Sequence, residues 1–297
     1  MSYVTAVCRT LSARHTNKFI LMKLPRYTPV LPDRDELEGL LKVAGLAADA
    51  AASITLRYFR ASIDIENKAS AGGFDPVTIA DKEAELAIRS ILGEHYPAIG
   101  FYGEEHEAIA GSSGLMWVVD PIDGTRAFMS GMPLWGTLIG LYNGENAILG
   151  MMDQPFLKER YFAFSESASL ETAEFTRSLA TRRVPELEEA VAYCTTPDMF
   201  TDKAARACFE RVRSECLLMR YGGDCYAYAL LAAGHIDLVL DCDLQPYDIQ
   251  ALIPIVNAAG GVVTNWNGDS AVDGGYVVAS GSTALHDKVL SILQLPK

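Results

Sequence analysis

The chain has 297 residues, 49% of them hydrophobic, and a formal net charge of −13. This length suffices for one large domain or two packed subdomains, and the charge excludes nucleic-acid binders, which cluster Lys and Arg against phosphates. No uninterrupted apolar run reaches the roughly 18 residues that span a bilayer, so we expect neither a nucleic-acid partner nor a membrane segment. The six cysteines show no CxxC pair or zinc-ligand spacing, which favours free thiols in a reducing compartment.

The first 32 residues contain five basic residues and no acidic residue. Such a composition is typical of a transit peptide. It would also arise from a start codon placed too early, because Met22 could open a shorter chain. We expect residues 1–32 to be a disordered extension and the protein to be cytoplasmic, or organellar if this segment is a transit peptide.

The first half of the remaining chain predicts two helices followed mainly by strands. The first helix has an acidic start and an alanine-rich body, and the second carries apolar residues at helical spacing before Pro97. Asn143-Gly144 predicts a hairpin between two strands. In chain order the predicted elements are a helix at 33–60, a loop at 66–78, a helix around 84–92, strands at 99–105 and 114–120, the hairpin at 135–153 and a strand at 158–164.

The second half alternates between helix-like and strand-like segments. The predicted elements are a strand at 190–196, helices at 201–213 and 225–234, a strand at 235–241, a helix at 247–261, strands at 262–266 and 276–280, and a helix at 282–293. Antiparallel strands followed by α/β alternation indicate a layered α/β sandwich. We expect one domain over 33–297, with subdomains at about 33–165 and 166–297.

Acidic residues recur where these elements begin or end. They are Asp81, Glu104, Glu105, Asp120, Asp123 and Asp248. Each has a structural explanation by itself: Asp81 could complement a helix dipole, Asp248 could cap a helix, and the glutamates could solvate a loop.

The stretch WVVDPIDGT is harder to explain structurally. Asp120 and Asp123 follow an apolar run, and two carboxylates on one rigid turn repel each other unless a cation lies between them. Hard oxygen ligands are those that Mg²⁺ prefers. The intervening proline stiffens the backbone so that the Ile122 carbonyl can also face the ion, and the N–H groups of Gly124 and Thr125 could bind phosphate.

Four motifs together resemble the magnesium-dependent inositol monophosphatase superfamily. They are DPVTIAD at 75–81, GEE at 103–105, DPIDGT at 120–125, and Asp248 followed by ALIPIVNAAGG. The resemblance covers about residue 35 to the C-terminus. It implies a layered α-β-α-β-α sandwich of the inositol monophosphatase and fructose-1,6-bisphosphatase type, a single catalytic phosphatase domain over 33–297, and a homodimer.

The resemblance also implies two Mg²⁺ ions per active site, with a third left open. Glu104, Asp120 and the Ile122 carbonyl would hold one ion. Asp120, Asp123 and Asp248 would hold the other. Paired ions of this kind stabilise the attacking and leaving oxygens of an in-line displacement.

The implied catalytic residues are Asp81, Glu104 and Thr125. A metal-bound water would attack phosphorus, oriented by Thr125 and, through the metal and water network, by Asp81. Phosphate oxygens would lie on the N–H groups of Gly124 and Thr125.

Three departures from the inositol phosphatase pattern resemble the histidinol-phosphate phosphatase branch. Arg126-Ala127-Phe128 replaces a polar residue followed by Asn-Phe, Tyr247 replaces Trp, and the loop 222–226 reads GGDCY in place of a run of small residues. We predict that the substrate contacts Gly124, Thr125, Arg126, Asp224, Asp241 and Asp248.

Asp224 and Asp241 give this branch assignment a physical basis. Two carboxylates near the leaving group suit a substrate with an ammonium group and an imidazole, through charge-assisted hydrogen bonds. A polyol would gain less, because Asp224 is costly if it is buried and unpaired. Asp224 could instead cap the following helix, and Arg126 could face the phosphate or pair with an acid near the dimer contact.

We therefore expect a Mg²⁺-dependent phosphomonoesterase that hydrolyses L-histidinol phosphate to L-histidinol and phosphate in histidine biosynthesis. One alternative is an inositol-1-phosphate or broad sugar-phosphate phosphatase. Another is a metal-binding scaffold that has lost activity. Histidines such as His106 and His286 lie outside every motif and are expected to be surface or structural residues.

Overall fold

A computed structural model describes residues 23–61, 65–67 and 76–294. Its helices are α1 Arg34–Tyr58, α2 Ile79–His95, α3 Thr125–Met129, α4 Lys203–Glu215, α5 Asp224–Ala232, α6 Pro246–Ile249, α7 Leu252–Ala258 and α8 Thr283–Leu293, with short 3-10 turns η1 Leu187–Glu189 and η2 Pro197–Met199. Its strands are β1 Ile65–Asn67, β2 Pro76–Thr78, β3 Gly100–Gly103, β4 Met116–Asp123, β5 Gly136–Tyr142, β6 Ala147–Gln154, β7 Glu159–Phe164, β8 Ser167–Thr172, β9 Thr176–Ser178, β10 Val191–Cys194, β11 Leu218–Tyr221, β12 Leu238–Leu244, β13 Val262–Asn265 and β14 Gly275–Ser280.

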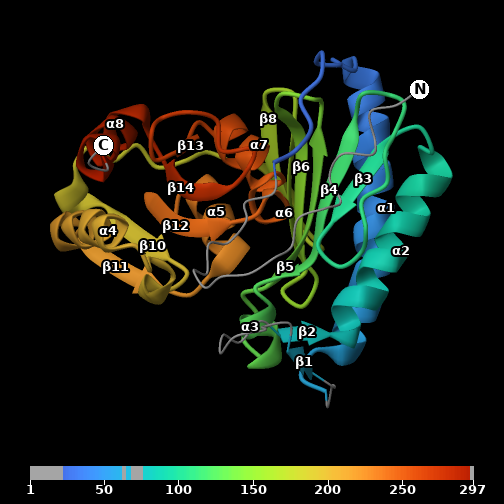
Figure 1. Ribbon diagram of the computed structural model, residues 1–297, viewed down its shortest axis with the longest axis horizontal. Helices are drawn as coiled ribbons and strands as arrows, with labels where there is room; N and C mark the ends of the chain where they lie inside the picture. The colour runs from blue at the N-terminus through green and yellow to red at the C-terminus, as the bar shows by residue number, and fades with distance from the viewer. Residues whose placement is uncertain (1–22, 62–64, 68–75, 295–297) are drawn as a thin grey trace, which may run out of the picture.

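Two large sheets and three helical layers alternate across the molecule (Figure 1). The seven-stranded sheet has the order β3-β4-β5-β6-β7-β8-β9, in which only β3 and β4 are parallel. The five-stranded sheet has the order β11-β10-β12-β14-β13. Helices α1 and α2 cover the outside of the first sheet, α5, α6 and α7 lie between the sheets, and α4 and α8 cover the outside of the second. The predicted α-β-α-β-α sandwich is confirmed.

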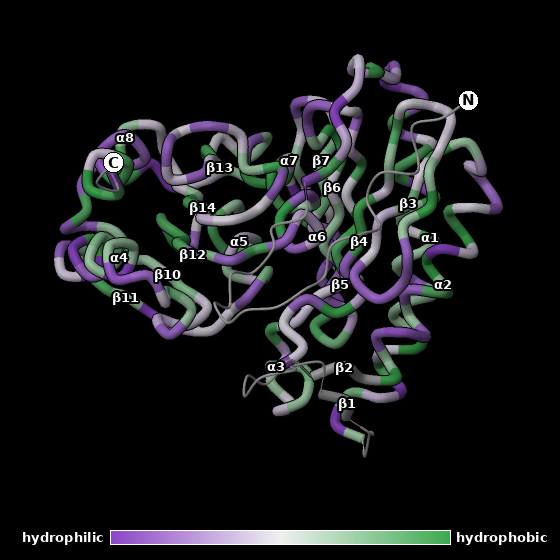
Figure 2. Tube along the Cα trace, viewed as in Figure 1, coloured by the Kyte–Doolittle hydropathy of each residue, from purple (hydrophilic) through white to green (hydrophobic). Residues whose placement is uncertain are grey.

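Alternation along the strands explains why the first sheet is covered on both faces. On β4, Trp117 and Val119 pack into the core under α1 and α2, whereas Val118 packs into the core shared with α5 and α7. Successive side chains of a strand point to opposite faces, so a strand buried on both sides is apolar throughout. In Figure 2 green segments run through the strands and hydrophilic colours gather at outer turns.

Helix α1 begins as the sequence predicts, with Asp33 as its N-cap accepting a hydrogen bond from the Glu36 N–H at 2.9 Å. By length and composition alone it could cross a membrane, although our reading of apolar runs gave no such segment. Core helices pass the same test, and the apolar stripe of α1, which includes Leu40 and Ala47, is buried against α2 and the sheet. Packing in the core therefore accounts for its hydrophobicity.

The N-terminal strap, residues 23–32, packs on the fold. Leu24 is buried in the core between the sheets, and its N–H donates to Asp273 Oδ1 at 3.2 Å. Arg26 bonds to Asp273 at 2.8 Å and to the Tyr142 hydroxyl at 2.6 Å. Our expectation that residues 1–32 lie outside the fold is therefore wrong for 23–32, and residues 1–22 lie outside the described residues.

Candidate active site

A bulge in β4 brings Asp120 and Asp123 to one side of the sheet. Asp120 pairs with Leu138, and Asp123 pairs with Gly136. An advance of three residues along β4 therefore matches an advance of only two residues along β5. In a regular strand, residues three apart point to opposite faces, and one extra residue restores a common face. We predicted a turn after the strand, but the strand continues through Asp123, and the bulge gives the two carboxylates their common direction.

Asp248 reaches the same place from the second half of the chain. Carboxylate oxygens of Asp120, Asp123 and Asp248, here called the acidic cluster, lie within 4.8 Å of one another. Asp248 is the third residue of α6, where its side chain accepts the Gln245 N–H at 2.7 Å. It is therefore not the N-cap that we considered, although it does help to close the first turn of α6.

Two further acids add negative charge around Asp120. Asp81, in the first turn of α2, is 1% exposed, and Glu104 follows the end of β3. Burial raises the pKa of Asp120 well above its usual value, and Glu104, Asp123, Asp248 and Asp81 raise it further. Asp81 and Glu104 therefore lie near enough to Asp120 to act on its charge, whereas the carboxylates brought within 4.8 Å of one another are those of Asp120, Asp123 and Asp248.

Burial also raises the pKa of the two other carboxyls of the acidic cluster. Burial raises the pKa of Asp123 to about 6, even though hydrogen bonds from Cys225 lower it. The pKa of Asp248 is raised well above its usual value by burial and then by Asp123. A cation between carboxylates crowded in this way would stabilise their ionised forms.

This donor set fits a divalent cation. Mg²⁺ takes oxygen ligands and neutralises repulsion between carboxylates held close together. No cysteine or histidine belongs to the acidic cluster, which disfavours the softer metals. We predicted from WVVDPIDGT that Asp120 and Asp123 would provide oxygen ligands for one cation, and their carboxylates do lie close together.

The turn after the acidic cluster is built from Ile122, Gly124 and Thr125. Gly124 has φ 81° and begins α3, and a side chain in this left-handed region would be strained. The Thr125 hydroxyl donates to the Ile122 carbonyl at 3.1 Å, so this predicted metal ligand and predicted catalytic hydroxyl contact each other. The first N–H groups of α3 have no partner within the helix and could bind an anion.

Asp224 contacts this turn at Gly124. A Cβ at Gly124 would lie 3.1 Å from the Asp224 Cβ, so the two residues are in contact. Asp224 is the first residue of α5, after Gly223 as N-cap, and has φ 43°. It is therefore not the helix cap that we considered. Burial and the neighbouring Asp123 and Asp241 raise its pKa to about 8, whereas Arg126 lowers it.

Asp241, a predicted substrate contact, is bonded within the protein in this structure. Its side chain is 1% exposed, and its two oxygens accept hydrogen bonds from the Thr195 N–H at 2.8 Å and the Tyr228 hydroxyl at 3.1 Å. In this structure it joins β12 to β10 and α5 beneath the site. It acts on the site through charge, by raising the pKa values of Asp123 and Asp224.

Sequence reasoning missed three residues around the acidic cluster. The Cys225 N–H donates to Asp123 Oδ2 at 2.6 Å and so orients that carboxylate from the other half of the chain. Tyr102 and Tyr247 stack with ring centroids 6.1 Å apart, and Asp248 contributes to raising the pKa of Tyr102 to about 12, after burial. Tyr247, as a replacement for Trp, and Cys225, within the unusual loop 222–226, gave a signal in the sequence without a predicted role, whereas Tyr102 gave none.

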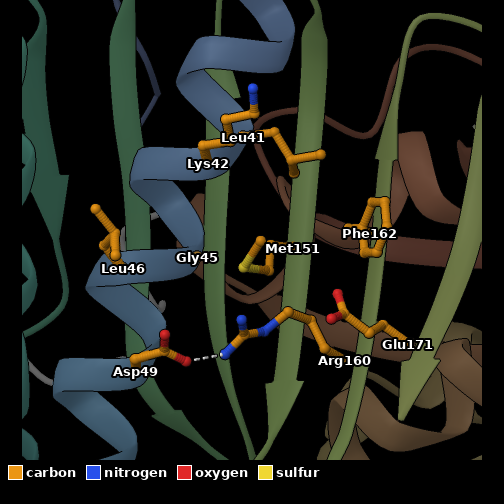
Figure 3. A pocket seen from close by; sticks show the side chains of 9 residues that line it. All are labelled: Leu41, Lys42, Gly45, Leu46, Asp49, Met151, Arg160, Phe162 and Glu171. Carbon is orange, nitrogen blue, oxygen red and sulfur yellow. Dashed lines mark hydrogen bonds and ion pairs between the residues drawn. The ribbon is translucent and has the colours of Figure 1, made fainter. Parts of the chain in front are cut away.

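A groove of about 400 Å³ lies elsewhere, between α1 and strands β6, β7 and β8 (Figure 3). It is lined by Leu41, Lys42, Gly45, Leu46, Asp49, Met151, Arg160, Phe162 and Glu171. Arg160 pairs there with Asp49 at 2.6 Å and with Asp153 at 2.7 Å. None of the predicted site residues lines this groove, so we do not assign the chemistry to it.

Known proteins resemble this chain over most of its length. The model of the inositol monophosphatase family matches residues 36–295. A chloroplastic bifunctional phosphatase of Arabidopsis thaliana, IMPL2, is 40% identical over 270 residues, which cover 87% of this chain and 76% of that protein. A histidinol-phosphatase of Chlorobaculum parvum is 31% identical over 85% of this chain and 96% of its own length.

The fold is also shared with solved structures. An inositol monophosphatase from Zymomonas mobilis has a TM-score of 0.78 and 37% identity, over 88% of this chain and 100% of that chain. The suhB protein of Bartonella henselae has a TM-score of 0.78 and 26% identity, over 86% of this chain and 98% of that chain. This chain therefore belongs to the inositol monophosphatase family and is a metal-dependent phosphomonoesterase of that family.

Proposed function

We propose that the substrate is L-histidinol phosphate, which the protein hydrolyses to L-histidinol and phosphate in histidine biosynthesis. The contact between Asp224 and Gly124 carries this proposal. The pKa of Asp224 is raised to about 8, so this carboxyl ionises most readily beside a cation, and its ionised form repels a phosphate monoester that has no other charge. It favours a phosphate ester whose alcohol part carries an ammonium group and an imidazole, because each can donate a charge-assisted hydrogen bond.

In this proposal Glu104, Asp120, the Ile122 carbonyl, Asp123 and Asp248 hold two Mg²⁺ ions. Bound Mg²⁺ supplies Lewis acidity at the phosphoryl oxygens and stabilises the attacking and leaving oxygens of the displacement.

Protein groups would position the substrate. The N–H groups of Gly124 and Thr125 bind phosphate oxygens at the start of α3, where the exposed Arg126 can neutralise further charge. The Thr125 hydroxyl and Asp81 orient the attacking water, and Asp224 holds the leaving group.

Names of relatives support the substrate class without fixing it. Relatives named histidinol-phosphatase come from three bacteria and are each 31% identical to this chain. An inositol-1-monophosphatase of Caulobacter vibrioides is 28% identical. The alternative substrates, inositol 1-phosphate and sugar phosphates, are therefore the ones against which the proposal is to be tested.

Replacement of Asp224 tests the substrate directly. We choose Asp224→Asn because asparagine tolerates a positive φ and keeps the shape of the side chain. Loss of charge-assisted hydrogen bonds should lower kcat/KM for histidinol phosphate about 10- to 100-fold. Inositol 1-phosphate turnover should stay unchanged or rise, because the carboxylate that repels its phosphate is removed. Equal losses on both substrates, measured as phosphate release, would refute the assigned role of Asp224.

The oligomer and the cellular location are also proposals. The family resemblance predicts a homodimer, which analytical ultracentrifugation of the purified protein would test. The Arabidopsis relative is named chloroplastic, which favours the organellar alternative for the basic N-terminal segment. A processing site would then lie before Lys23, because the N-terminal strap packs on the fold.

A further inference from the structure

A buried carboxylate outside the acidic cluster organises the loop that carries Glu104. Glu85 lies on α2, one helical turn after Asp81, and its side chain is 0% exposed. Its oxygens accept the Glu105 N–H at 2.7 Å and the His106 N–H at 3.1 Å, and His106 Nδ1 lies 3.0 Å from Oε1. Bonds to a charged acceptor are stronger than neutral ones, so this carboxylate holds the backbone directly after Glu104.

Arg89 completes this arrangement one turn further along α2. Its guanidinium donates to Glu85 Oε1 at 3.1 Å and to the Glu107 carbonyl at 3.0 Å, and it stacks over the Phe101 ring at 4.5 Å. We define residues 103–107 as the Glu104 loop. Glu85 accepts hydrogen bonds from two backbone N–H groups of this loop, and Arg89 donates one to a backbone carbonyl of it. Two backbone hydrogen bonds of 2.8 Å between Phe101 and Ile109 close the same loop.

Gly103 fixes the other side of Glu104. A Cβ at Gly103 would lie 2.4 Å from Glu85 Oε2, a distance that only glycine avoids. Glu104 thus stands between a residue packed against Glu85 and a residue whose N–H is bonded to Glu85. Because Asp81 and Glu85 share one helix, α2 sets the positions of both Asp81 and Glu104 relative to the acidic cluster.

We propose that Glu85 is a positioning residue that sets the affinity of the site for its divalent cation by holding the Glu104 loop. The proposal rests on the proposed role of Glu104 as a metal ligand. A residue that orients a ligand without touching the metal affects affinity by about 10- to 100-fold when removed. A merely structural ion pair on α2 would change stability and leave the affinity of the folded protein unchanged.

The first measurement is Mn²⁺ binding to purified Glu85→Gln protein, followed by the electron paramagnetic resonance signal of free Mn²⁺. We expect the tightest binding to weaken about 10- to 100-fold. Glu94→Gln is the matched control, because Glu94 lies on the same helix and is exposed, and it should bind like the unchanged protein. Thermal melts verify that each variant is folded, and wild-type affinity in a folded Glu85→Gln protein would overturn the proposal.

A double-variant cycle tests whether Glu85 acts through Glu104. If it does, Glu85→Gln/Glu104→Gln should bind Mn²⁺ no more weakly than Glu104→Gln alone. If the double variant instead loses Mn²⁺ affinity by the product of the two single-variant losses, Glu85 acts independently of Glu104, and the proposal is overturned. If Glu85→Gln does not fold, Arg89→Lys replaces it, because this variant keeps the charge but loses the planar guanidinium, and unchanged Mn²⁺ affinity in the folded Arg89→Lys protein would count against the proposal.

Asp120→Asn separates this inference from the proposed metal site itself. If Asp120→Asn loses Mn²⁺ binding and Glu85→Gln binds Mn²⁺ like the unchanged protein, only the role of Glu85 is overturned. Unchanged Mn²⁺ binding in both Asp120→Asn and Glu104→Gln would instead refute the proposed metal site.

Discussion

At the scale of single residues, the Asp123 carboxylate both accepts a hydrogen bond within the protein and belongs to the acidic cluster that would bind a cation. The Cys225 N–H donates to its Oδ2, while one carboxylate oxygen of Asp123 lies within 4.8 Å of those of Asp120 and Asp248. Burial nevertheless raises its pKa to about 6, so a proton and a metal ion compete for the same group near neutral pH. Metal binding at such a site is linked to proton release.

Metal affinity should therefore depend on pH. Because the raised pKa of Asp123 favours the protonated form, affinity should fall as pH falls through about 6, by about tenfold between pH 8 and pH 5 if one proton competes. Asp120 and Asp248, with pKa values raised in the same direction, should steepen the change. Calorimetric titration with Mn²⁺ checks this without involving the titratable substrate, and equal affinity at both pH values would contradict it.

Asp120→Asn should separate activity from stability. The change removes a predicted ligand of both ions, and turnover should fall about a thousandfold or more, since a metal ion contributes several kcal/mol to transition-state stabilisation. It also removes repulsion between closely spaced carboxylates, so the metal-free protein should melt at the same or a higher temperature. Substantial phosphatase activity in this variant would refute the metal assignment. A defect confined to binding of a partner protein would favour the scaffold alternative.

At the scale of elements, long periodic segments were predictable and short or long-range features were not. Helix α1 and the β5–β6 hairpin at Asn143-Gly144 follow local rules, and both predictions are confirmed. The exposed edge strand β11 has no apolar alternation to reveal it. The predicted helix at 247–261 divides into α6 and α7, and this break places Asp248 in a separate short turn.

The N-terminal strap was missed because its partners are distant in sequence. Leu24 bonds to Asp273 and Arg26 contacts both Tyr142 and Asp273, so a segment read as a basic leader joins the two halves of the molecule. Composition reports the average character of such a segment. It does not report that one leucine has a buried site more than two hundred residues away.

Truncation should locate the boundary of the fold. Deletion of residues 1–32 should cost about 2 kcal/mol relative to deletion of residues 1–22, mainly from the lost burial of Leu24. This corresponds to a decrease of several degrees in Tm. Equal melting temperatures for the two truncated proteins, measured by calorimetry, would show that the strap does not stabilise the fold.

At the scale of the whole molecule, the acidic cluster depends on both halves of the chain. The first half supplies Asp120 and Asp123, which the bulge in β4 brings to one side of the sheet, and the second half supplies Asp248. Motif order was enough to predict this convergence, because it carried the resemblance to a known family. It did not reveal that both oxygens of Asp241 accept hydrogen bonds within the protein, and its predicted substrate contact stays a prediction.

The most direct test of the account is phosphate release by the purified protein from histidinol phosphate and from inositol 1-phosphate, each with Mg²⁺ and with EDTA. The account predicts release that requires Mg²⁺ and strongly favours histidinol phosphate. Preference for inositol 1-phosphate would keep the metal site but contradict the role of Asp224, and no release from either substrate with Mg²⁺ present would contradict the central claim.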